Sequence, residues 1–499
     1  MLEVVSFICG AGVMVLEMAG ARLLAPYLGT SIVVWTAMIG VVLASLSVGY
    51  WLGGKMGDKN PSARKLGLII AAGAVFVLLA ALAQAPVLSV VAGASWPLQV
   101  SAVAAAVLLF TIPCVFLGMV SPYIIQVRLL DYTDKNRNST VIGRFYALST
   151  IGSIAGTFLG GYWLISLLGT RVILYAVAGV LALAALMVMP RGRKMPAALV
   201  LGACMGLGGY TALSVQESLT SGLDIDTRYN HIRIIEGMLD GHRVRYMITD
   251  PGSAQSGMRV DDPNHLLFDY TQHYAIGRHI KQDAKTFLML GGGGYSVPKY
   301  LMHSTKDATI DVVEIDPGIT QAARDYFGLK DDPRMAIFHE DARVFLNRAV
   351  REGGAGKYDM VMGDTFTSSY NIPFHLGTVE CAEHIKALLK DDGVFVCNII
   401  SAVSGPRGKV LRSIRAAFAE VFPQTHVFPV SAPHRPDAVQ NVMLVAVKTE
   451  QSIPLAWDPA MQTMLGKEYK LPLEQDVVAL TDDYAPVERY AMPMLDGRN

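Results

Sequence analysis

The residues best suited to chemistry in this chain are a run of glycines and an acid that follows it. The apolar segment Leu288–Leu290 leads directly into four consecutive glycines, namely Gly291, Gly292, Gly293 and Gly294. A second apolar segment ends at Glu314, twenty residues after the last glycine. In open α/β sheets, such a turn admits close approach of a ligand, and an acid at this spacing accepts the ribose hydroxyls. The pattern predicts an adenosine site, whereas a glycine turn alone would show only a tight strand-to-helix connection.

Strands and helices that alternate along the second half must position these residues. Strands are expected at 286–290, 309–315, 334–338, 358–362 and 394–397, and helices near 296–303, 317–327, 341–351 and 378–390. This alternation predicts a parallel doubly wound sheet, whose ligands bind at the carboxyl ends of the strands. The glycine turn, Glu314 and Asp364 each follow a strand, so we expect them at one edge. Shorter strands between Tyr229 and about Tyr270 predict a small β region before this sheet.

The composition of the first half of the chain is typical of a transmembrane domain. Residues 1–215 hold 13 Lys and Arg against 5 Asp and Glu, whereas the remaining residues hold 29 against 37. No charged residue occurs from Leu66 to Val127, and about 20 apolar residues suffice for one transmembrane helix. We expect seven spans, at about 4–28, 32–54, 66–92, 98–125, 143–167, 170–190 and 196–214.

The expected fold is therefore an α-helical membrane bundle followed by an α/β doubly wound, Rossmann-like domain. The predicted parts are a transmembrane domain (1–215), a linker (216–228), a small β region (229–275) and a nucleoside-binding catalytic domain (276–499). The second half is acidic and lacks a basic stripe, which argues against nucleic acid as a partner. Five scattered cysteines show neither metal-binding spacing nor a disulfide framework, and we expect no metal. The expected partners are the bilayer and a small nucleoside. The sequence leaves open whether the protein also forms a homo-oligomer.

Several motifs resemble the spermidine synthases, and specifically the bacterial membrane-fused spermidine-synthase-like proteins. The motifs that carry the resemblance are the glycine turn and residues 229–232, 239–241, 313–316, 340–343, 358–359, 364 and 481–488. In the first half, residues 49–54 before a basic loop resemble a loop of major-facilitator transporters. The resemblance implies an enzyme of the bacterial inner membrane. Its substrate would be S-adenosylmethionine or the decarboxylated form, with methylthioadenosine released and no further cofactor.

The resemblance also assigns roles to individual residues. Glu314 would hold the ribose next to Asp316 of the same motif, and Asp341 with Ala342 would face the adenine amino group. Asp364 would lie beside the sulfonium and help to deprotonate an amine acceptor. The remaining candidates around the ligand are Asp269, His273 and the tyrosines Tyr229, Tyr270 and Tyr370, with residues 368–370 as a lid.

Two departures from the family pattern concern the amine. The family has an aspartate where this chain has Gly294, and a second acid where this chain has Thr367. A dicationic acceptor needs paired carboxylates to offset its desolvation, so their loss favours cleavage of the sulfonium without a polyamine. That lyase reading would give methylthioadenosine and homoserine lactone, or an elimination product. An aminopropyltransferase with an altered amine and a nucleoside-sensing transporter are the alternatives. Both departures lie on loops, where substitution is expected to leave the core intact.

Basic residues predict the membrane orientation. They gather at 55–65, 128–144 and 191–194, so the positive-inside rule places these loops and the N-terminus in the cytoplasm. Seven spans would then put the second half outside, whereas nucleoside substrates of this kind are cytosolic. Either the weak last span, 196–214, does not cross the membrane, or the site faces the far side.

Overall fold

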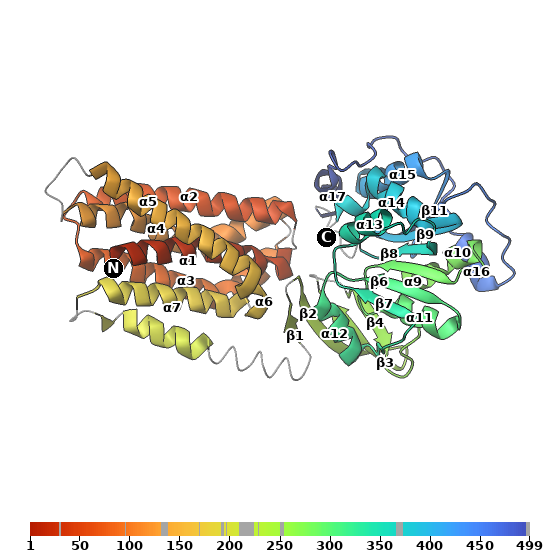
Figure 1. Ribbon diagram of the computed structural model, residues 1–499, viewed down its shortest axis with the longest axis horizontal. Helices are drawn as coiled ribbons and strands as arrows, with labels where there is room; N and C mark the ends of the chain where they lie inside the picture. The colour runs from red at the N-terminus through yellow and green to blue at the C-terminus, as the bar shows by residue number, and fades with distance from the viewer. Residues whose placement is uncertain are drawn as a thin grey trace. The chain divides into compact units, whose positions relative to one another are not determined.

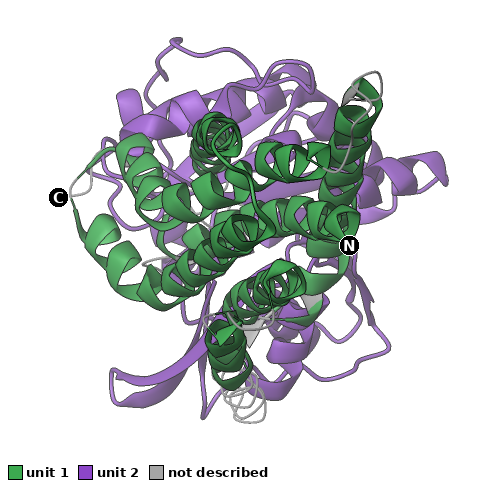
Figure 2. Ribbon diagram, turned by 90° about the vertical axis from the view of Figure 1, so that its left-hand side faces the viewer, with its two compact units in different colours: residues 1–228 green, residues 229–499 purple. Residues whose placement is uncertain are grey.

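The chain divides into two compact units, Met1–Arg228 and Tyr229–Asn499, which are coloured separately in Figure 2. The structure is a computed structural model. It describes the whole chain except residues 29–30, 95, 131–137, 169, 191–193, 196, 209–223, 228, 250–253, 366–372 and 496–499. Tyr370, Thr367 and the predicted lid at 368–370 therefore lie outside the described residues.

The first unit consists of long apolar helices (Figure 1). They are α1 (Leu2–Leu28), α2 (Ile32–Gly57), α3 (Ala63–Gly93), α4 (Leu98–Leu129), α5 (Asn138–Leu159), the π-helical turn η2 (Gly160–Leu164), α6 (Ile165–Leu167) and α7 (Thr170–Val188). Close backbone packing joins α5 to α1, because a Cβ at Gly152 or Gly156 would lie within 2.4 Å of an α1 carbonyl oxygen. Small residues of this kind let membrane helices approach each other closely.

Five helices in the described part of the chain are long and apolar enough to span a membrane. They are Leu2–Ala25, Ile32–Gly57, Ala63–Gly93, Leu98–Leu129 and Thr170–Val188. The predicted count of seven is not confirmed. The predicted span at 143–167 is divided among α5, η2 and α6, and the described part of the last one is the short helix Ala197–Gly208.

The second unit begins with an antiparallel β region. Its strands are β2 (His231–Leu239), β3 (His242–Ile248) and β4 (Ser256–Arg259), and the three-residue β1 (Asp224–Asp226) precedes them in the chain. A tight turn at Asp240 and Gly241, both with positive φ, joins β2 to β3. Asp-Gly at such a turn is a strong hairpin signal, because both positions must adopt left-handed backbone conformations.

A seven-stranded mixed sheet in the order β10-β11-β9-β8-β5-β6-β7 forms the centre of the second unit. Its strands are β5 (Thr286–Leu290), β6 (Thr309–Val313), β7 (Met335–Phe338), β8 (Tyr358–Gly363), β9 (Leu389–Ser401), β10 (Gln424–Pro429) and β11 (Gln440–Val447). The five strands from β9 to β7 are parallel, as the alternating pattern predicts. Two further strands that the sequence did not predict make the sheet mixed, because β11 runs antiparallel to both β9 and β10. No helix lies between β10 and β11, so this pair forms a hairpin rather than a crossover.

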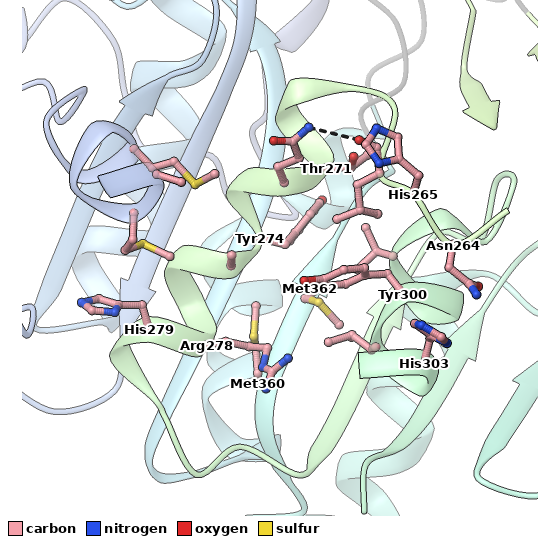
Figure 3. A pocket seen from close by; sticks show the side chains of 18 of the residues that line it. Asn264, His265, Thr271, Tyr274, Arg278, His279, Tyr300, His303, Met360 and Met362 are labelled. Atoms are coloured by element: carbon pink, nitrogen blue, oxygen red, sulfur yellow. Dashed lines mark hydrogen bonds between the residues drawn. The ribbon is translucent and has the colours of Figure 1, made fainter. Parts of the chain in front are cut away.

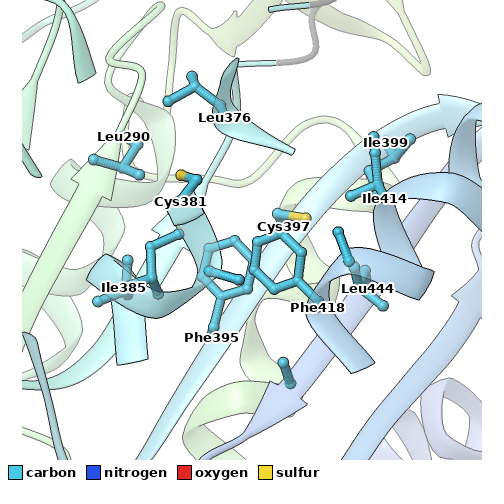
Figure 4. Close-up of a cluster of buried hydrophobic side chains, with 14 of the residues drawn as sticks. Leu290, Leu376, Cys381, Ile385, Phe395, Cys397, Ile399, Ile414, Phe418 and Leu444 are labelled. Atoms are coloured by element: carbon cyan, nitrogen blue, oxygen red, sulfur yellow. The ribbon is translucent and has the colours of Figure 1, made fainter. Parts of the chain in front are cut away.

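Helices cover both faces of this sheet (Figure 1). They are α9 (Asp269–His273), α10 (Ala275–Ile280), α11 (Ser296–Ser304), α12 (Pro317–Tyr326), α13 (Ala342–Arg351), α14 (Val379–Leu388), α15 (Lys409–Val421), α16 (Pro459–Leu465) and α17 (Val487–Leu495), with the 3-10 turns η4 (Phe374–Leu376) and η5 (Pro406–Gly408). The main core lies under α14 and α15, where the rings of Phe395 and Phe418 stack with centroids 4.9 Å apart (Figure 4). Side chains alternate along β8, so Val361 points into this core and its neighbours point to the other face.

Candidate active site

The point at which the chain reverses its direction of winding lies between β5 and β8. From β5 the chain continues to β6 and β7, and it then returns to form β8 on the other side of β5. Leu290 at the end of β5 pairs with Gly363 at the end of β8. Ligands of open α/β sheets bind at such a reversal, outside the carboxyl ends of the strands. The glycine turn and Asp364 both lie there, as the sequence predicts.

Gly291 brings the end of β5 against the end of β8. Its φ is +93°, and a Cβ at this position would lie 2.5 Å from the carbonyl oxygen of Asp364. Its backbone N–H donates to the carbonyl of Val313, 2.8 Å away. Both the left-handed backbone and the close approach require glycine here. The turn is therefore fixed between the two strands that flank it.

Glu314 fixes the next residues of the turn. Its Oε2 accepts hydrogen bonds from the N–H groups of Gly292 at 2.9 Å and Gly293 at 3.2 Å, and its Oε1 accepts from the N–H of Asp316 at 2.9 Å. The residue is only 7% exposed, and burial raises its pKa while these hydrogen bonds oppose that rise. A carboxylate has about four acceptor positions. A ribose at this site would therefore share Glu314 with the turn.

Asp316 has a structural role in helix α12. Its Oδ1 accepts the N–H of Gly318 at 2.9 Å, which caps the helix, and its Oδ2 accepts from the Asn230 side chain at 2.8 Å. The residue is 1% exposed. Such a cap satisfies backbone donors that the first turn leaves unpaired. The structure thus uses Asp316, predicted to bind the nucleoside, to start the helix behind the site.

Asp341 also caps a helix, but it keeps one oxygen for another partner. Its Oδ1 accepts from the N–H groups of Arg343 and Val344 at 2.8 and 3.2 Å, at the start of α13. Its Oδ2 lies 3.4 Å from Nε2 of His375, and this contact lowers the pKa of the carboxyl group. The next residue, Ala342, is buried. His375 was not predicted, because the segment that forms η4 carries none of the motifs named above.

Asp364 stands at the end of β8 and receives two side-chain hydrogen bonds. Its Oδ2 accepts from the hydroxyl of Tyr270 in α9, and its Oδ1 accepts from Nδ2 of Asn398 in β9, each at 3.1 Å. Asn398 is 2% exposed, and its Oδ1 in turn accepts from Nδ2 of Asn441 in β11 at 2.9 Å. Four elements therefore hold the orientation of one carboxyl group. The sequence predicted Tyr270 but missed both asparagines, because an isolated Asn in an apolar strand carries no motif.

The environment of Asp364 sets its proton affinity. Burial raises its pKa from 3.8 to about 6, and the hydrogen bonds from Asn398 and Tyr270 limit that rise. Burial and the charge of Asp364 raise the pKa of Tyr270 far above its usual value. The hydroxyl of Tyr270 therefore stays protonated and acts as a hydrogen-bond donor to Asp364. A carboxyl group with a pKa near neutrality is suited to accept a proton during a reaction. Its charged form would also attract a cation.

The remaining predicted residues that the structure describes are Asp269, His273 and Tyr229. Asp269 is exposed, and its backbone carbonyl contacts Nδ1 of His273 at 2.8 Å. His273 is 3% exposed, its Nε2 lies 3.5 Å from Nζ of Lys467, and burial lowers its pKa. A buried imidazole held in this way supports the packing of α9 rather than chemistry at Asp364. Tyr229 is 43% exposed at the start of the unit, immediately before Asn230.

Gly294 closes the turn against strand β4. Its N–H donates to the hydroxyl of Ser256 at 2.8 Å, and a Cβ at this position would lie 2.9 Å from Cβ of Ser256 and 3.2 Å from the ring of Phe327. The expectation that Gly294 tolerates a side chain without disturbance is therefore wrong. Ser256 occupies the space into which a side chain at this position would extend. In the parts of the chain that the structure describes, no three His, Cys, Asp or Glu side chains gather as a metal site would require.

Comparisons with known proteins find similarity in this half of the chain. Residues 271–454 match the family model described as the spermine/spermidine synthase domain. A polyamine aminopropyltransferase from Vibrio vulnificus is 32% identical over 185 residues, which cover 36% of this chain and 59% of that protein. An N-terminal histidine N-methyltransferase from Emericella nidulans is 26% identical over 262 residues, which cover 49% of this chain and 45% of that protein. The chain thus spans about half the length of these relatives.

Among solved structures, a probable spermidine synthase from Corynebacterium glutamicum is similar, at 21% identity and a TM-score of 0.42. The match covers 49% of this chain and 85% of that one. The part of the chain that matches the spermine/spermidine synthase model, residues 271–454, follows an N-terminal region of several apolar helices.

Proposed function

We propose that the second unit is an enzyme of the aminopropyltransferase kind, which acts on an S-adenosylmethionine-type sulfonium donor. The observation that carries the proposal is the carboxyl group of Asp364, held at the strand reversal by Tyr270 and Asn398 with a pKa of about 6. An amine acceptor is protonated at neutral pH and must lose a proton to react. A carboxyl group with this pKa, next to the adenosine-type turn, is suited to take it.

In the proposed reaction, the amine nitrogen attacks the propyl carbon that carries the sulfonium. A carbon–nitrogen bond forms and the carbon–sulfur bond breaks, so the sulfur keeps the electron pair and leaves as the neutral thioether methylthioadenosine. The proton of the amine passes to Asp364. Before the attack, the ionised carboxylate stabilises both cations at the site, and the fixed donors from Tyr270 and Asn398 preorganise it for this task.

Cleavage without an amine acceptor is the second candidate. The observation in its favour is Gly294, where Ser256 fills the space in which the family's pattern has an acid. A missing negative charge there would favour a donor that keeps its own carboxylate. The donor's carboxylate would then displace the sulfonium and form homoserine lactone. Lactone formation needs no base, so the raised pKa of Asp364 would have no role in this reaction.

Incubation of the full chain with the two donors separates these functions. Each donor, S-adenosylmethionine or its decarboxylated form, is supplied with and without a diamine, and methylthioadenosine is followed by chromatography. We expect product only when the decarboxylated donor and an amine are both present. Product from S-adenosylmethionine alone would replace this proposal by the cleavage reaction. No product under any condition would favour a unit that only binds the nucleoside, as a sensor or transporter would.

A further inference from the structure

A cavity of about 740 Å³ lies on the other face of the sheet from the main core (Figure 3). Its walls come from α9, α10, α11, β8 and α16. Neither the glycine turn nor Glu314, Asp341 or Asp364 contributes to its lining. Pockets for small ligands typically have volumes of about 300–1,000 Å³. The cavity is therefore large enough for a ligand of its own, separate from the nucleoside.

The lining of this cavity combines polar side chains with an apolar surface that is rich in methionine. Met360 and Met362 of β8 form one side, and Met461 and Met464 of α16 form another. Figure 3 shows Met362 close to the rings of Tyr274 and Tyr300. Methionine side chains are flexible and polarizable, so such a surface adapts to an irregular or flexible apolar chain. A flexible hydrocarbon fits this lining better than a rigid polar molecule.

Arg278 supplies a positive charge at the edge of the cavity. Its side chain is half-buried beside Met360 (Figure 3), and it forms no hydrogen bond or ion pair with any residue that the structure describes. The two acids at the rim are occupied: Asp458 caps α16 through the N–H groups of Ala460 and Met461, and Asp262 accepts the N–H of Asn264. A half-buried guanidinium without a partner favours an anionic ligand group.

Exposed apolar side chains lie in the segment that precedes α16, the helix that supplies part of the lining. His279 lines the cavity, and its Nε2 contacts the carbonyl of Pro454 at 2.7 Å, which fixes the segment that leads to α16. In that segment Leu455 is 84% exposed and Trp457 is 90% exposed. Large apolar residues in this setting mark contact with an apolar partner, and Trp is frequent at the membrane–water interface.

We propose that this cavity binds an anionic amphiphile, with its charged head at Arg278 and its hydrocarbon chain along the methionine lining. Two sources share this chemistry, namely a free fatty acid with a carboxylate head and a lysophospholipid with a phosphate head. The proposal does not depend on the reaction at Asp364. Because Tyr274 lines the cavity and its hydroxyl donates to the carbonyl of Gly363 at 2.6 Å, the ligand would lie one hydrogen bond from the strand end that carries Asp364.

Photo-crosslinking of the full chain in zwitterionic nanodiscs tests the proposal. The probes are a long-chain fatty acid with a diazirine, a lysophosphatidic acid with the same chain, and the matching uncharged fatty alcohol. Labelled peptides are quantified by mass spectrometry, and labelling of the apolar helices of the first unit is the internal reference. We expect at least one anionic probe to label the peptides that contain Tyr300 or Met461, and the alcohol to label them much less. The labelling anion identifies the source.

Two variants with matched controls test the charge and the space separately. Arg278→Gln should reduce pocket labelling roughly tenfold at low probe concentration, the effect of losing one charge-assisted contact. Ala275→Phe places a ring in the cavity and should abolish pocket labelling. The controls Arg435→Gln and Ala355→Phe change exposed residues outside the lining and should leave it unchanged. Equal labelling by anion and alcohol, pocket labelling that persists in both pocket variants, or no pocket labelling by any probe would overturn the proposal.

Discussion

Asp364 combines burial, which opposes its charge, with two donors that stabilise that charge. Its pKa is raised from 3.8 to about 6, so the folded protein holds this proton over a pH range in which the unfolded chain releases it. The charge therefore costs folding stability as the pH rises from about 4 to 6, and this cost persists at neutral pH. A group that weakens the fold when ionised, yet lies at the strand reversal, is best explained by a role in chemistry.

The pH profile of the proposed reaction should report this group. Because the base must be ionised, kcat/KM should rise as the pH passes about 6 and become level above it. Asp364→Asn keeps the shape of the side chain but removes the base, so turnover should fall by at least about 100-fold. Nucleoside binding should change far less, which equilibrium dialysis with methylthioadenosine would show. Wild-type turnover in this variant would mean that the chemistry does not use Asp364.

Glu314 allows an independent test of the adenosine site. In the native protein both side-chain oxygens of Glu314 accept hydrogen bonds from the backbone. Glu314→Gln leaves only one acceptor oxygen, so the backbone contacts of the turn and any ribose contact should weaken together. Affinity for S-adenosylmethionine and for methylthioadenosine should fall in parallel by roughly tenfold, measured by calorimetry. Glu352→Gln changes an exposed acid on the surface and is the matched control. Unchanged affinity for both ligands would show that the ribose binds elsewhere.

At the scale of elements, β9 and β11 supply the asparagine pair that holds Asp364. Asn398→Leu removes one of the two hydrogen bonds that limit the pKa of Asp364, so this pKa should rise further. The acidic limb of the pH–rate profile should then move to higher pH, with much of the activity recovered in alkaline buffer. Asn441→Ala should cause a smaller shift, because it acts only through Asn398. A uniform loss at all pH values, without movement of the limb, would indicate simple damage to the fold.

The contact between β4 and the glycine turn governs whether an acid can be placed at position 294. Gly294→Asp alone should lower thermal stability, because its Cβ meets Ser256 and Phe327. With Ser256→Gly added, part of that loss should be recovered, and the new carboxylate should favour the decarboxylated donor over S-adenosylmethionine by charge repulsion. Competition between the two donors measures this preference, and Ser256→Gly alone is the control. If the preference does not change in the double variant, Gly294 does not select the donor.

At the scale of the whole molecule, the number of membrane crossings determines on which side the site lies. The continuous segment from α5 to α6 covers residues 138–167 and is long enough to cross, at 1.5 Å per residue. The described helix Ala197–Gly208 spans only about 18 Å, short of the roughly 30 Å hydrocarbon core. We therefore expect six crossings, which from a cytoplasmic N-terminus would return the chain to the cytoplasm.

A reporter fused after Asn499 tests this count. We expect a reporter that works only in the cytoplasm to be active and one that works only outside it to be silent. The physical basis is the positive-inside rule applied to the three basic connections. A matched fusion within the connection between α2 and α3 should behave in the same way as the C-terminal fusion. Activity only outside the cytoplasm at the C-terminus, with the control fusion inside, would restore the seventh crossing.

The sequence by itself determined the order of the strands from β5 to β9 and the positions of the glycine turn, Glu314 and Asp364 at their ends. Apolar runs, glycines and acids act through local rules, so they locate the strands from β5 to β9, the glycine turn, Glu314 and Asp364. The tertiary structure alone decided which polar groups meet. It paired Asn398 and Asn441 across neighbouring strands, brought the hydroxyl of Tyr270 to Asp364 and placed Ser256 against Gly294. Such contacts depend on strand register and join residues 38 to 94 positions apart, which no local pattern in the sequence records.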